Sequence, residues 1–348
     1  MSPAYEPLVR AIGWIDGIAF GLALLLILAA CALRIAQKKK LRREHDFLAV
    51  WHPLLLNALA SSIPPHLPML AADERVPFLK LWNSLMRDAG GEAAHNLIDV
   101  ARAIGCDRFA RHMLHHGSRA ECLLATMALG HLCDQVAREA LTTQTLAADS
   151  ITSLHALHAL VRIDADTTAA ELTPLMLART DWSIAQVASI VQTAQNAFAP
   201  TLLTAVADHP AEHLPRTLRL LEALHLSPPP AVLIALLKRD DAEIVAAALR
   251  TIHDTEMLPQ VRPLLRHDDW RVRLQAAKVV GHLGEEADVN RLVPLLADAE
   301  WWVRYRTAQA LVGMHSFGRA EAEMLRDNLA DRFARDMLAQ ALAEKDAA

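Results

Sequence analysis

The sequence has few of the residues on which β-sheets and enclosed catalytic sites depend. It includes only 12 glycines among 348 residues, and aromatic residues make up 5%. The glycines form no Gly-x-x-x-x-Gly-Lys, Gly-x-Gly-x-x-Gly or Gly-x-Ser-x-Gly motif, so phosphate-binding loops and nucleophile elbows are not indicated. Alternating runs of Val, Ile and Thr are missing, and 53% of the residues are apolar, mainly Ala and Leu. This composition predicts an all-α chain. The sequence identifies no catalytic residue.

Patterns for metal binding and for disulfides are also missing. The four cysteines (Cys31, Cys106, Cys122 and Cys133) form no Cys-x-x-Cys pair, which is typical of a reducing compartment, and we interpret them as buried small residues. The seventeen histidines include close pairs such as His112 with His116, but no His-Glu dipeptide occurs. We therefore expect no metal ion and no cofactor.

Two stretches near the C-terminus repeat with an offset of 31 residues. The first is Pro263-Leu264-Leu265 followed by Asp269-Trp270-Arg271-Val272-Arg273, and the second is Pro294-Leu295-Leu296 followed by Glu300-Trp301-Trp302-Val303-Arg304. Each continues into small residues that indicate a second helix, and weaker copies precede them. One such helix pair cannot bury its own apolar face, so the repeat predicts a solenoid of antiparallel helix pairs.

This order of a proline-led first helix, an acidic turn, Val-Arg and an alanine-rich second helix resembles the HEAT repeat family. The resemblance implies a scaffold or adaptor that binds partner proteins, and it predicts that the chain is not an enzyme. An enzyme built on similar repeats, such as a lyase or a metal-dependent hydroxylase, is the alternative. We predict degenerate repeats over residues 47–227, and clear repeats with a C-terminal cap over residues 228–348.

The N-terminal part has a different composition. Residues 11–36 form an apolar stretch with no charge from Gly17 to Leu33, long enough to cross a hydrocarbon core of about 30 Å as a helix. A cleaved signal peptide is the competing interpretation, but its positive charge should precede the apolar run. Here a single basic residue precedes the run and six follow it. The positive-inside rule then places residues 1–10 outside the cytoplasm and the bulk of the chain within it.

Two features of this region suggest partners. The basic residues of the linker at 37–46 serve as a topology signal and are also able to attract anionic lipid headgroups; they are Lys38, Lys39, Lys40, Arg42 and Arg43. Gly13, Gly17 and Gly21 recur every four residues and so share one helical face, where a second copy or a polytopic membrane protein would approach closely. Chance spacing of glycines in a membrane helix is the alternative.

Charge argues against nucleic acid as a partner. The first 46 residues hold seven of the 35 Lys and Arg and four of the 40 Asp and Glu, so the remaining 302 have a formal net charge of −8. Helical proteins that bind nucleic acid need a basic face for phosphate. A solenoid with this net negative charge, behind a membrane anchor, is a poor candidate for binding nucleic acid.

The candidate protein-binding residues belong to the second helices of the clear repeats and their turns. Trp, Tyr and Arg are the residues most often found as interface anchors, and second helices of HEAT proteins usually line the concave face. Arg273 and Arg304 are expected to pair with turn acids, and Trp270 and Trp301 have helix capping as an alternative role. The predicted set is Trp270, Arg271, Trp301, Trp302, Tyr305 and Arg306.

The layout of the whole chain adds a second resemblance. An N-terminal anchor, a basic run, the segment Phe78-Leu79-Lys80-Leu81-Trp82-Asn83 and degenerate repeats together resemble bacterial membrane-anchored HEAT proteins encoded in exopolysaccharide clusters. That resemblance implies a single-pass protein of the bacterial inner membrane, accessory to a membrane glycosyltransferase.

Overall fold

The computed structural model describes residues 6–60, 66–208, 213–315 and 317–347. Every regular element in these ranges is an α-helix or a short 3₁₀ helix, as the composition predicts. The chain divides into two compact units at residues 140 and 141. The proline run at 228–230, where the sequence suggests a domain boundary, lies inside the second unit between α11 and α12.

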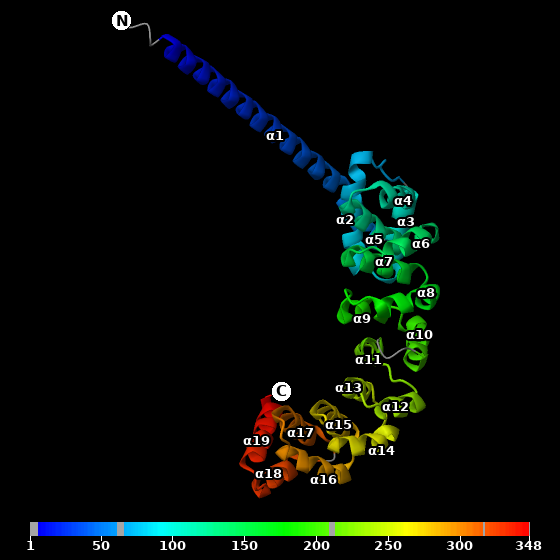
Figure 1. The fold of residues 1–348 in the computed structure, drawn as a ribbon. Coiled ribbons are helices and arrows are strands. Elements are labelled where there is room, and N and C mark those ends of the chain that lie inside the picture. The colour runs from blue at the N-terminus through cyan, green and yellow to red at the C-terminus, as the bar shows by residue number, and fades with distance from the viewer. Residues whose placement is uncertain (1–5, 61–65, 209–212, 316, 348) are drawn as a thin grey trace. The chain divides into compact units, whose positions relative to one another are not determined.

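The first unit is built from helices α1 to α5. Helix α1 continues without a break through the predicted span at 11–36 and the predicted linker at 37–46, and its N-terminal part extends away from the other helices of the unit (Figure 1). The helices are α1 (Glu6–Ala60), α2 (Arg75–Asp88), α3 (Gly91–Ala103), α4 (Cys106–His116) and α5 (Arg119–His131), with the 3₁₀ helices η1 (Ala72–Glu74) and η2 (Gln135–Ala137).

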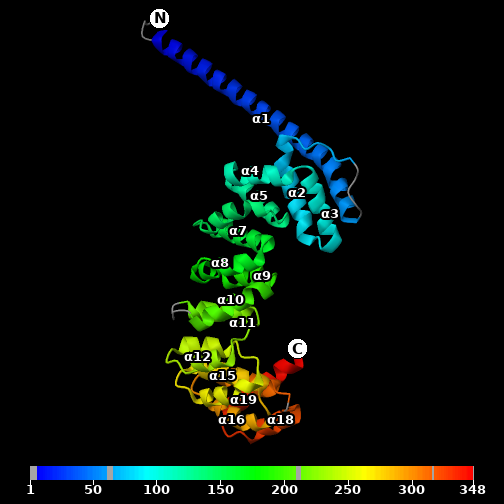
Figure 2. The same cartoon turned by 90° about the vertical axis from the view of Figure 1, so that its right-hand side faces the viewer.

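The C-terminal part of α1 packs against α2 and α3, as Figure 2 shows from a second direction. Trp51 of α1 is buried and meets the ring of Phe78 edge to face, with ring centroids 5.1 Å apart. Trp82 is also buried, and its Nε1 donates to the Leu97 carbonyl at 2.9 Å. Phe78 and Trp82 belong to the short motif that the whole-chain resemblance uses. In this structure that motif is part of the core of the first unit.

The second unit contains paired helices. Helix α6 (Arg138–Thr145) includes the point of division, and the first part of the second unit has α7 (Ser150–Ile163), α8 (Ala165–Ala178), α9 (Ile184–Gln192), α10 (Gln195–Asp208) and α11 (Leu214–Ala223). The later part has α12 (Pro230–Leu237), α13 (Ala242–Leu249), η3 (Thr255–Met257), α14 (Leu258–Val261), η4 (Arg262–Arg266), α15 (Trp270–Leu283), η5 (Glu286–Asp288), α16 (Val289–Leu292), η6 (Val293–Ala297), α17 (Trp301–Gly313), α18 (Arg319–Asn328) and α19 (Arg332–Ala347).

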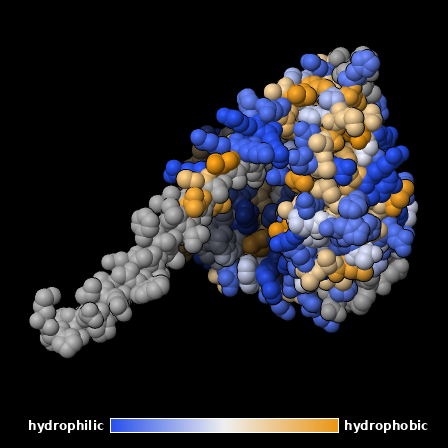
Figure 3. Space-filling view, turned by 90° about the horizontal axis from the view of Figure 1, so that it is seen from above, coloured by the Kyte–Doolittle hydropathy of each residue, from blue (hydrophilic) through white to orange (hydrophobic). Residues whose placement is uncertain are grey.

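These helices form two layers. Helices α7, α9, α11, α13, α15, α17 and α19 pack one against the next, and we call them the second-helix layer. The first-helix layer contains α8, α10, α12, α14 with η4, α16 with η6, and α18. Figure 1 shows the separation of the layers at α12 to α17. Figure 3 views the molecule from above, and on that face hydrophilic and apolar residues are interspersed. Helix pairs stacked in two such layers form an α-solenoid, as the repeat predicts.

Local chemistry explains the shape of the two clear repeats. Pro263 and Pro294 lack an amide N–H, and in both copies the first helix is a single α-turn followed by a 3₁₀ turn. The acidic turn then starts the second helix, because the Asp269 carboxylate accepts the Arg271 N–H at 2.8 Å. The small residues of α15 permit close stacking: a Cβ built on Gly281 would lie 2.4 Å from that of Ala310 in α17.

Carboxylates of the turns connect successive repeats. Asp288 is fully buried and accepts two hydrogen bonds from the Arg262 guanidinium, at 2.8 and 2.9 Å. Burial raises the pKa of Asp288, but hydrogen bonds from Arg262 and the Glu285 amide outweigh it, so the pKa lies below its ordinary value. At the C-terminal end, α19 covers α17, where the sequence predicts a cap.

Candidate functional site

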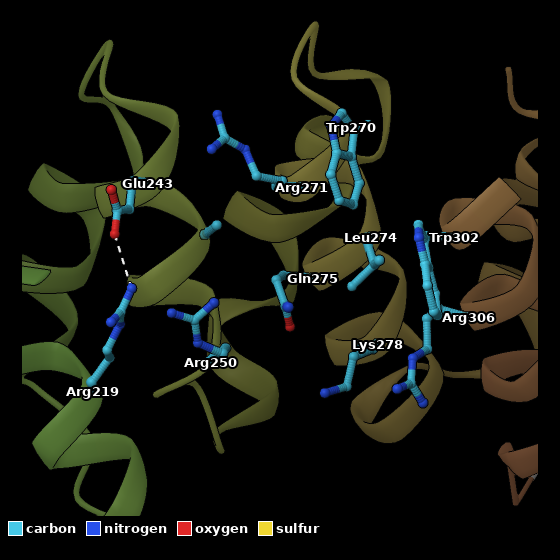
Figure 4. A pocket seen from close by; sticks show the side chains of 11 residues that line it. Arg219, Glu243, Arg250, Trp270, Arg271, Leu274, Gln275, Lys278, Trp302 and Arg306 are labelled. Carbon is cyan, nitrogen blue, oxygen red and sulfur yellow. Dashed lines mark hydrogen bonds and ion pairs between the residues drawn. The ribbon is translucent and has the colours of Figure 1, made fainter. Parts of the chain in front are cut away.

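Four neighbouring members of the second-helix layer, α11, α13, α15 and α17, line a surface cavity of about 470 Å³. We call it the second-helix groove, and Figure 4 shows its side chains. Helix α15 supplies Trp270, Arg271, Leu274, Gln275 and Lys278. The other lining residues are Arg219 of α11, Glu243, Ala246 and Arg250 of α13 and its C-terminal end, and Trp302 and Arg306 of α17.

Helical spacing brings these side chains to one surface. Trp270, Leu274 and Lys278 follow one another at intervals of four residues and therefore share a face of α15. Trp302 and Arg306 have the same spacing on α17. Because α15 packs directly on α17, the two faces are adjacent, and in Figure 4 Leu274 lies between the two indoles. Trp302 keeps 51% of its surface exposed, which is unusual for so large an apolar side chain.

The structure brings four of the six predicted interface residues into the groove: Trp270, Arg271, Trp302 and Arg306. The other two lie beside it. Trp301 stacks on Tyr305 with ring centroids 5.1 Å apart, and the Tyr305 hydroxyl donates to the Glu344 carboxylate of α19 at 2.9 Å. Tyr305 therefore holds α19 against α17, a contact that the repeat pattern does not contain.

Three of the five cations in the groove are paired with carboxylates of the chain. Arg219 meets Glu243 at 3.0 Å, and Arg250 meets Glu222 at 2.8 Å. Arg271 meets Asp269 at 2.7 Å, and this hydrogen-bonded partner lowers the pKa of Asp269 to about 2. Each of these three guanidinium groups therefore has an acidic partner within the chain.

The other two cations, Lys278 and Arg306, are placed differently. Among the residues that the structure describes, Lys278 has no hydrogen-bond or ion-pair partner, and its side chain is exposed. Arg306 donates to the Gln309 amide oxygen at 2.7 Å and lies 5.7 Å from the Tyr305 ring centroid. Neither has a carboxylate within ion-pair distance in the described part of the chain. Both belong to the same cavity, beside Trp302 (Figure 4).

The arginines of the Val-Arg pairs have a structural role, as expected. Arg273 makes two hydrogen bonds to Asp298 in the next turn, at 2.7 and 2.8 Å, and binds the carbonyls of His267 and Asp268. Burial raises the pKa of Asp298, but the Arg273 hydrogen bonds outweigh it and the pKa is lowered. Arg304 donates to the Asp298 and Ala299 carbonyls.

The described histidines and cysteines lie mostly apart from one another. His112 and His116 lie with ring centroids 4.8 Å apart on the exposed face of α4. No group of three or more His, Cys, Asp or Glu suited to a metal ion occurs within the described ranges. Of the cysteines, Cys106 is buried, but Cys31 and Cys133 are exposed. The interpretation of all four as buried residues is therefore wrong.

The structure describes the side chains of four of the eight N-terminal candidates. Gly13, Gly17, Gly21 and the side chain of Lys40 lie outside the residues whose side chains the structure describes. Searched over its described residues alone, the structure has no helix with the length and hydropathy of a membrane span. The remaining basic residues of the predicted linker are exposed, and Arg43 meets Asp73 at 3.2 Å; these residues are Lys38, Lys39, Arg42 and Arg43.

Comparison with known proteins agrees with the solenoid class that the fold defines. A family model of HEAT repeats matches residues 229–312, which include both copies of the 31-residue repeat, so the prediction of HEAT repeats is confirmed for this segment. The match also covers α13, α15 and Trp302 of the groove. No curated protein matches the chain.

Two solved structures are similar at low identity. One is an engineered protein, 17% identical, with a TM-score of 0.38; the match covers 80% of this chain and 92% of the other. The second is YibA from Escherichia coli, 13% identical, with a TM-score of 0.34; it covers 81% of this chain and 100% of the other.

Sequence reasoning missed several lining residues. Lys278 and Leu274 carry a readable signal, because they continue the four-residue spacing that starts at Trp270. Arg219 and Arg250 carry none, since α11 and α13 belong to repeats in which the Trp and Val-Arg positions of the later copies are not kept.

Proposed function

We propose that this protein is a binding scaffold, without an enzymatic role, and that the second-helix groove is its partner-binding surface. HEAT repeats generally act as protein-binding scaffolds, and residues 229–312 match that family. The observation that carries the proposal is the half-exposed Trp302 beside Trp270, in a groove bordered by arginines. Trp and Arg dominate the binding energy of most protein interfaces.

The proposal also includes a place in the cell. The apolar stretch at 11–36 and the basic residues after it support a single-pass protein of the bacterial inner membrane with a cytoplasmic solenoid. The glycine face at Gly13, Gly17 and Gly21 supports a membrane protein as one partner. The resemblance in layout supports an accessory role for a membrane glycosyltransferase of envelope polysaccharide synthesis.

A paired experiment on the full-length chain tests the groove. Trp302→Ala combined with Arg306→Ala should abolish partner capture from detergent-solubilised host membranes, because truncating an interface anchor typically costs about 2 kcal/mol or more, roughly thirty-fold in affinity. The thermal melt should be unchanged, since Trp302 is half exposed and Arg306 bonds only within α17. The matched control is Phe333→Ala with Arg266→Ala, two exposed residues outside the groove.

Each outcome of this experiment is informative. Lost capture with an unchanged melt, together with normal capture by the control, supports the groove. Full capture by the groove variant contradicts it. A large fall in melting temperature would assign both residues to packing rather than to binding.

A further inference from the structure

We propose that the partner segment held in the second-helix groove is acidic, with carboxylates at Lys278 and Arg306 and an apolar side chain against Trp302. This inference rests on the proposed function and names the chemistry of the partner. Three observations carry it: the two cations without carboxylate partners, the exposed indole next to them, and the acid Glu243 elsewhere in the groove.

The first observation is the unequal pairing of the cations. Glu243, Glu222 and Asp269 already bind three of the five, so an incoming anion at those three would compete with an acid of the chain. Lys278 and Arg306 remain, on adjacent helices of the same cavity. Glu344 of α19 forms no ion pair with Arg306, and it already accepts hydrogen bonds from Tyr305, Gln309 and Gln340. Carboxylates on a partner would form ion pairs with Lys278 and Arg306, which have none within the described chain.

The second observation is the apolar surface that adjoins these cations. Trp302, Leu274 and Trp270 lie next to one another in the groove, and half of the Trp302 side chain is exposed. Covering this indole removes apolar area from water, which favours an apolar side chain of the partner. Cations beside an indole therefore match a segment that carries both an apolar residue and carboxylates.

The third observation distinguishes a protein segment from a nucleic acid. A nucleic acid brings a phosphate at every nucleotide, and some would face Glu243, which lines the same groove. A polypeptide can place carboxylates at two positions and a neutral or basic residue opposite that acid. The net charge of −8 on residues 47–348 also disfavours a polyanion over the surface as a whole.

The first step of the test identifies the occupant. A photo-crosslinking amino acid is placed at Gln275, on the groove, in the full-length chain expressed in its host, and at Arg266, in the first-helix layer, as the matched control. Mass spectrometry then locates the crosslinked peptide. We expect a protein segment with at least two Asp or Glu near an aromatic or large aliphatic residue, from the Gln275 position only.

The second step measures binding of that peptide, made synthetically and labelled, to the full-length chain by fluorescence anisotropy. Lys278→Ala should weaken binding about threefold, Arg306→Ala about tenfold and Trp302→Ala about thirtyfold, and Arg266→Ala should leave it unchanged. A peptide with Gln in place of its acids should bind at least tenfold more weakly. Lys278→Glu with Arg306→Glu should reject the acidic peptide and accept a version with Lys in place of its acids, which a merely structural role would not produce.

The outcomes separate this inference from the proposed function. A neutral or basic segment crosslinked at Gln275 overturns the acidic partner and leaves the scaffold intact. Crosslinking to nucleic acid or lipid alone overturns the inference and the protein scaffold together. A peptide that binds equally well after Glu-to-Gln replacement also overturns the inference. If no protein is crosslinked from the groove, the proposed function fails as well.

Discussion

Arginine side chains of the C-terminal repeats have two kinds of partner. Arg262 and Arg273 each hold a largely buried turn carboxylate through two hydrogen bonds, and so join one repeat to the next. Arg306 instead stays on its own helix, bonded to Gln309. The same residue type is thus structural at a turn and available at the groove. Burial and the presence of a carboxylate decide which role it has.

Asp288 is the residue at which the structural role is tested. Asp288→Asn leaves Arg262 without its charged partner, and we expect a loss of about 2 kcal/mol of stability at pH 7, moderated because Arg262 is partly exposed. Urea denaturation of the full-length chain measures it. The control is Asp327→Asn, which breaks an exposed pair with Arg326 and should change stability by less than about 0.5 kcal/mol. Equal effects of the two variants would contradict the assignment.

The pH dependence follows from the same carboxylates. The pKa values of Asp288, Asp298 and Asp269 are lowered in the folded chain, that of Asp269 to about 2. Their stabilisation is therefore complete above the unfolded pKa of about 3.9 and is lost as pH falls through the folded values. We expect the urea midpoint to be level above about pH 5 and to fall between about pH 4 and 2. Asp288→Asn should make that fall shallower.

At the residue scale, the repeat locates the second helices and their turns, and residue type then selects interface candidates within them. Arg271, Trp302 and Arg306 differ between the two copies and are selected for that reason, and the structure places all three in the groove with Trp270. Tyr305 is also of a residue type typical of interfaces, but its hydroxyl bonds to Glu344, 39 positions along the chain. No local pattern encodes that contact, because it depends on how α19 returns against α17.

At the scale of elements, close stacking of α15 on α17 determines the shape of the groove. Gly281 faces Ala310, and any Cβ there would overlap it. Gly313, at the end of α17, has open space instead. The narrow small-residue face that the sequence predicts for the second helices is therefore required by this contact.

Gly281→Ala should consequently destabilise the solenoid. Overpacking costs about 1 to 3 kcal/mol, and the better helix propensity of Ala offsets up to about 1 kcal/mol of it. We expect a net loss of about 1 to 2 kcal/mol in thermal melts of the full-length chain. Gly313→Ala, the control, should be neutral or slightly stabilising. A melt of Gly281→Ala that matches the Gly313→Ala melt would show that the helices separate without cost.

Element boundaries were less predictable than element type. The 31-residue repeat indicates the paired helices, but it does not extend to α1, which is continuous from Glu6 to Ala60. The predicted span and basic linker are chemically distinct, and helical propensity persists through both, since Ala, Leu, Lys and Arg are all good helix formers. A change in composition is therefore not a change in secondary structure here.

For the whole molecule, the sequence supports a membrane anchor and the structure supports a solenoid in its second unit. The division at residues 140 and 141 could not be anticipated, because it depends on tertiary packing around Trp51, Phe78 and Trp82. Proline runs indicate helix ends, and the run at 228–230 separates two helices of one unit.

The proposed topology is tested on the intact chain. A reporter that is active only in the periplasm, fused after Ala348, should be silent, whereas a cytoplasmic reporter at the same position should be active. Six basic residues after the uncharged run Gly17–Leu33, against one before it, give this expectation. The same reporters fused to a chain that begins at Asp46 serve as the control for expression. A strong periplasmic signal would reverse the orientation.

Hydrogen exchange of the full-length chain, alone and with its captured partner, tests the central claim most directly. If the second-helix groove is the binding surface, exchange slows in α11, α13, α15 and α17, which form it, while η4 and η6 of the first-helix layer keep their rates. Protection confined to the first-helix layer, or spread equally over both layers, would contradict the account.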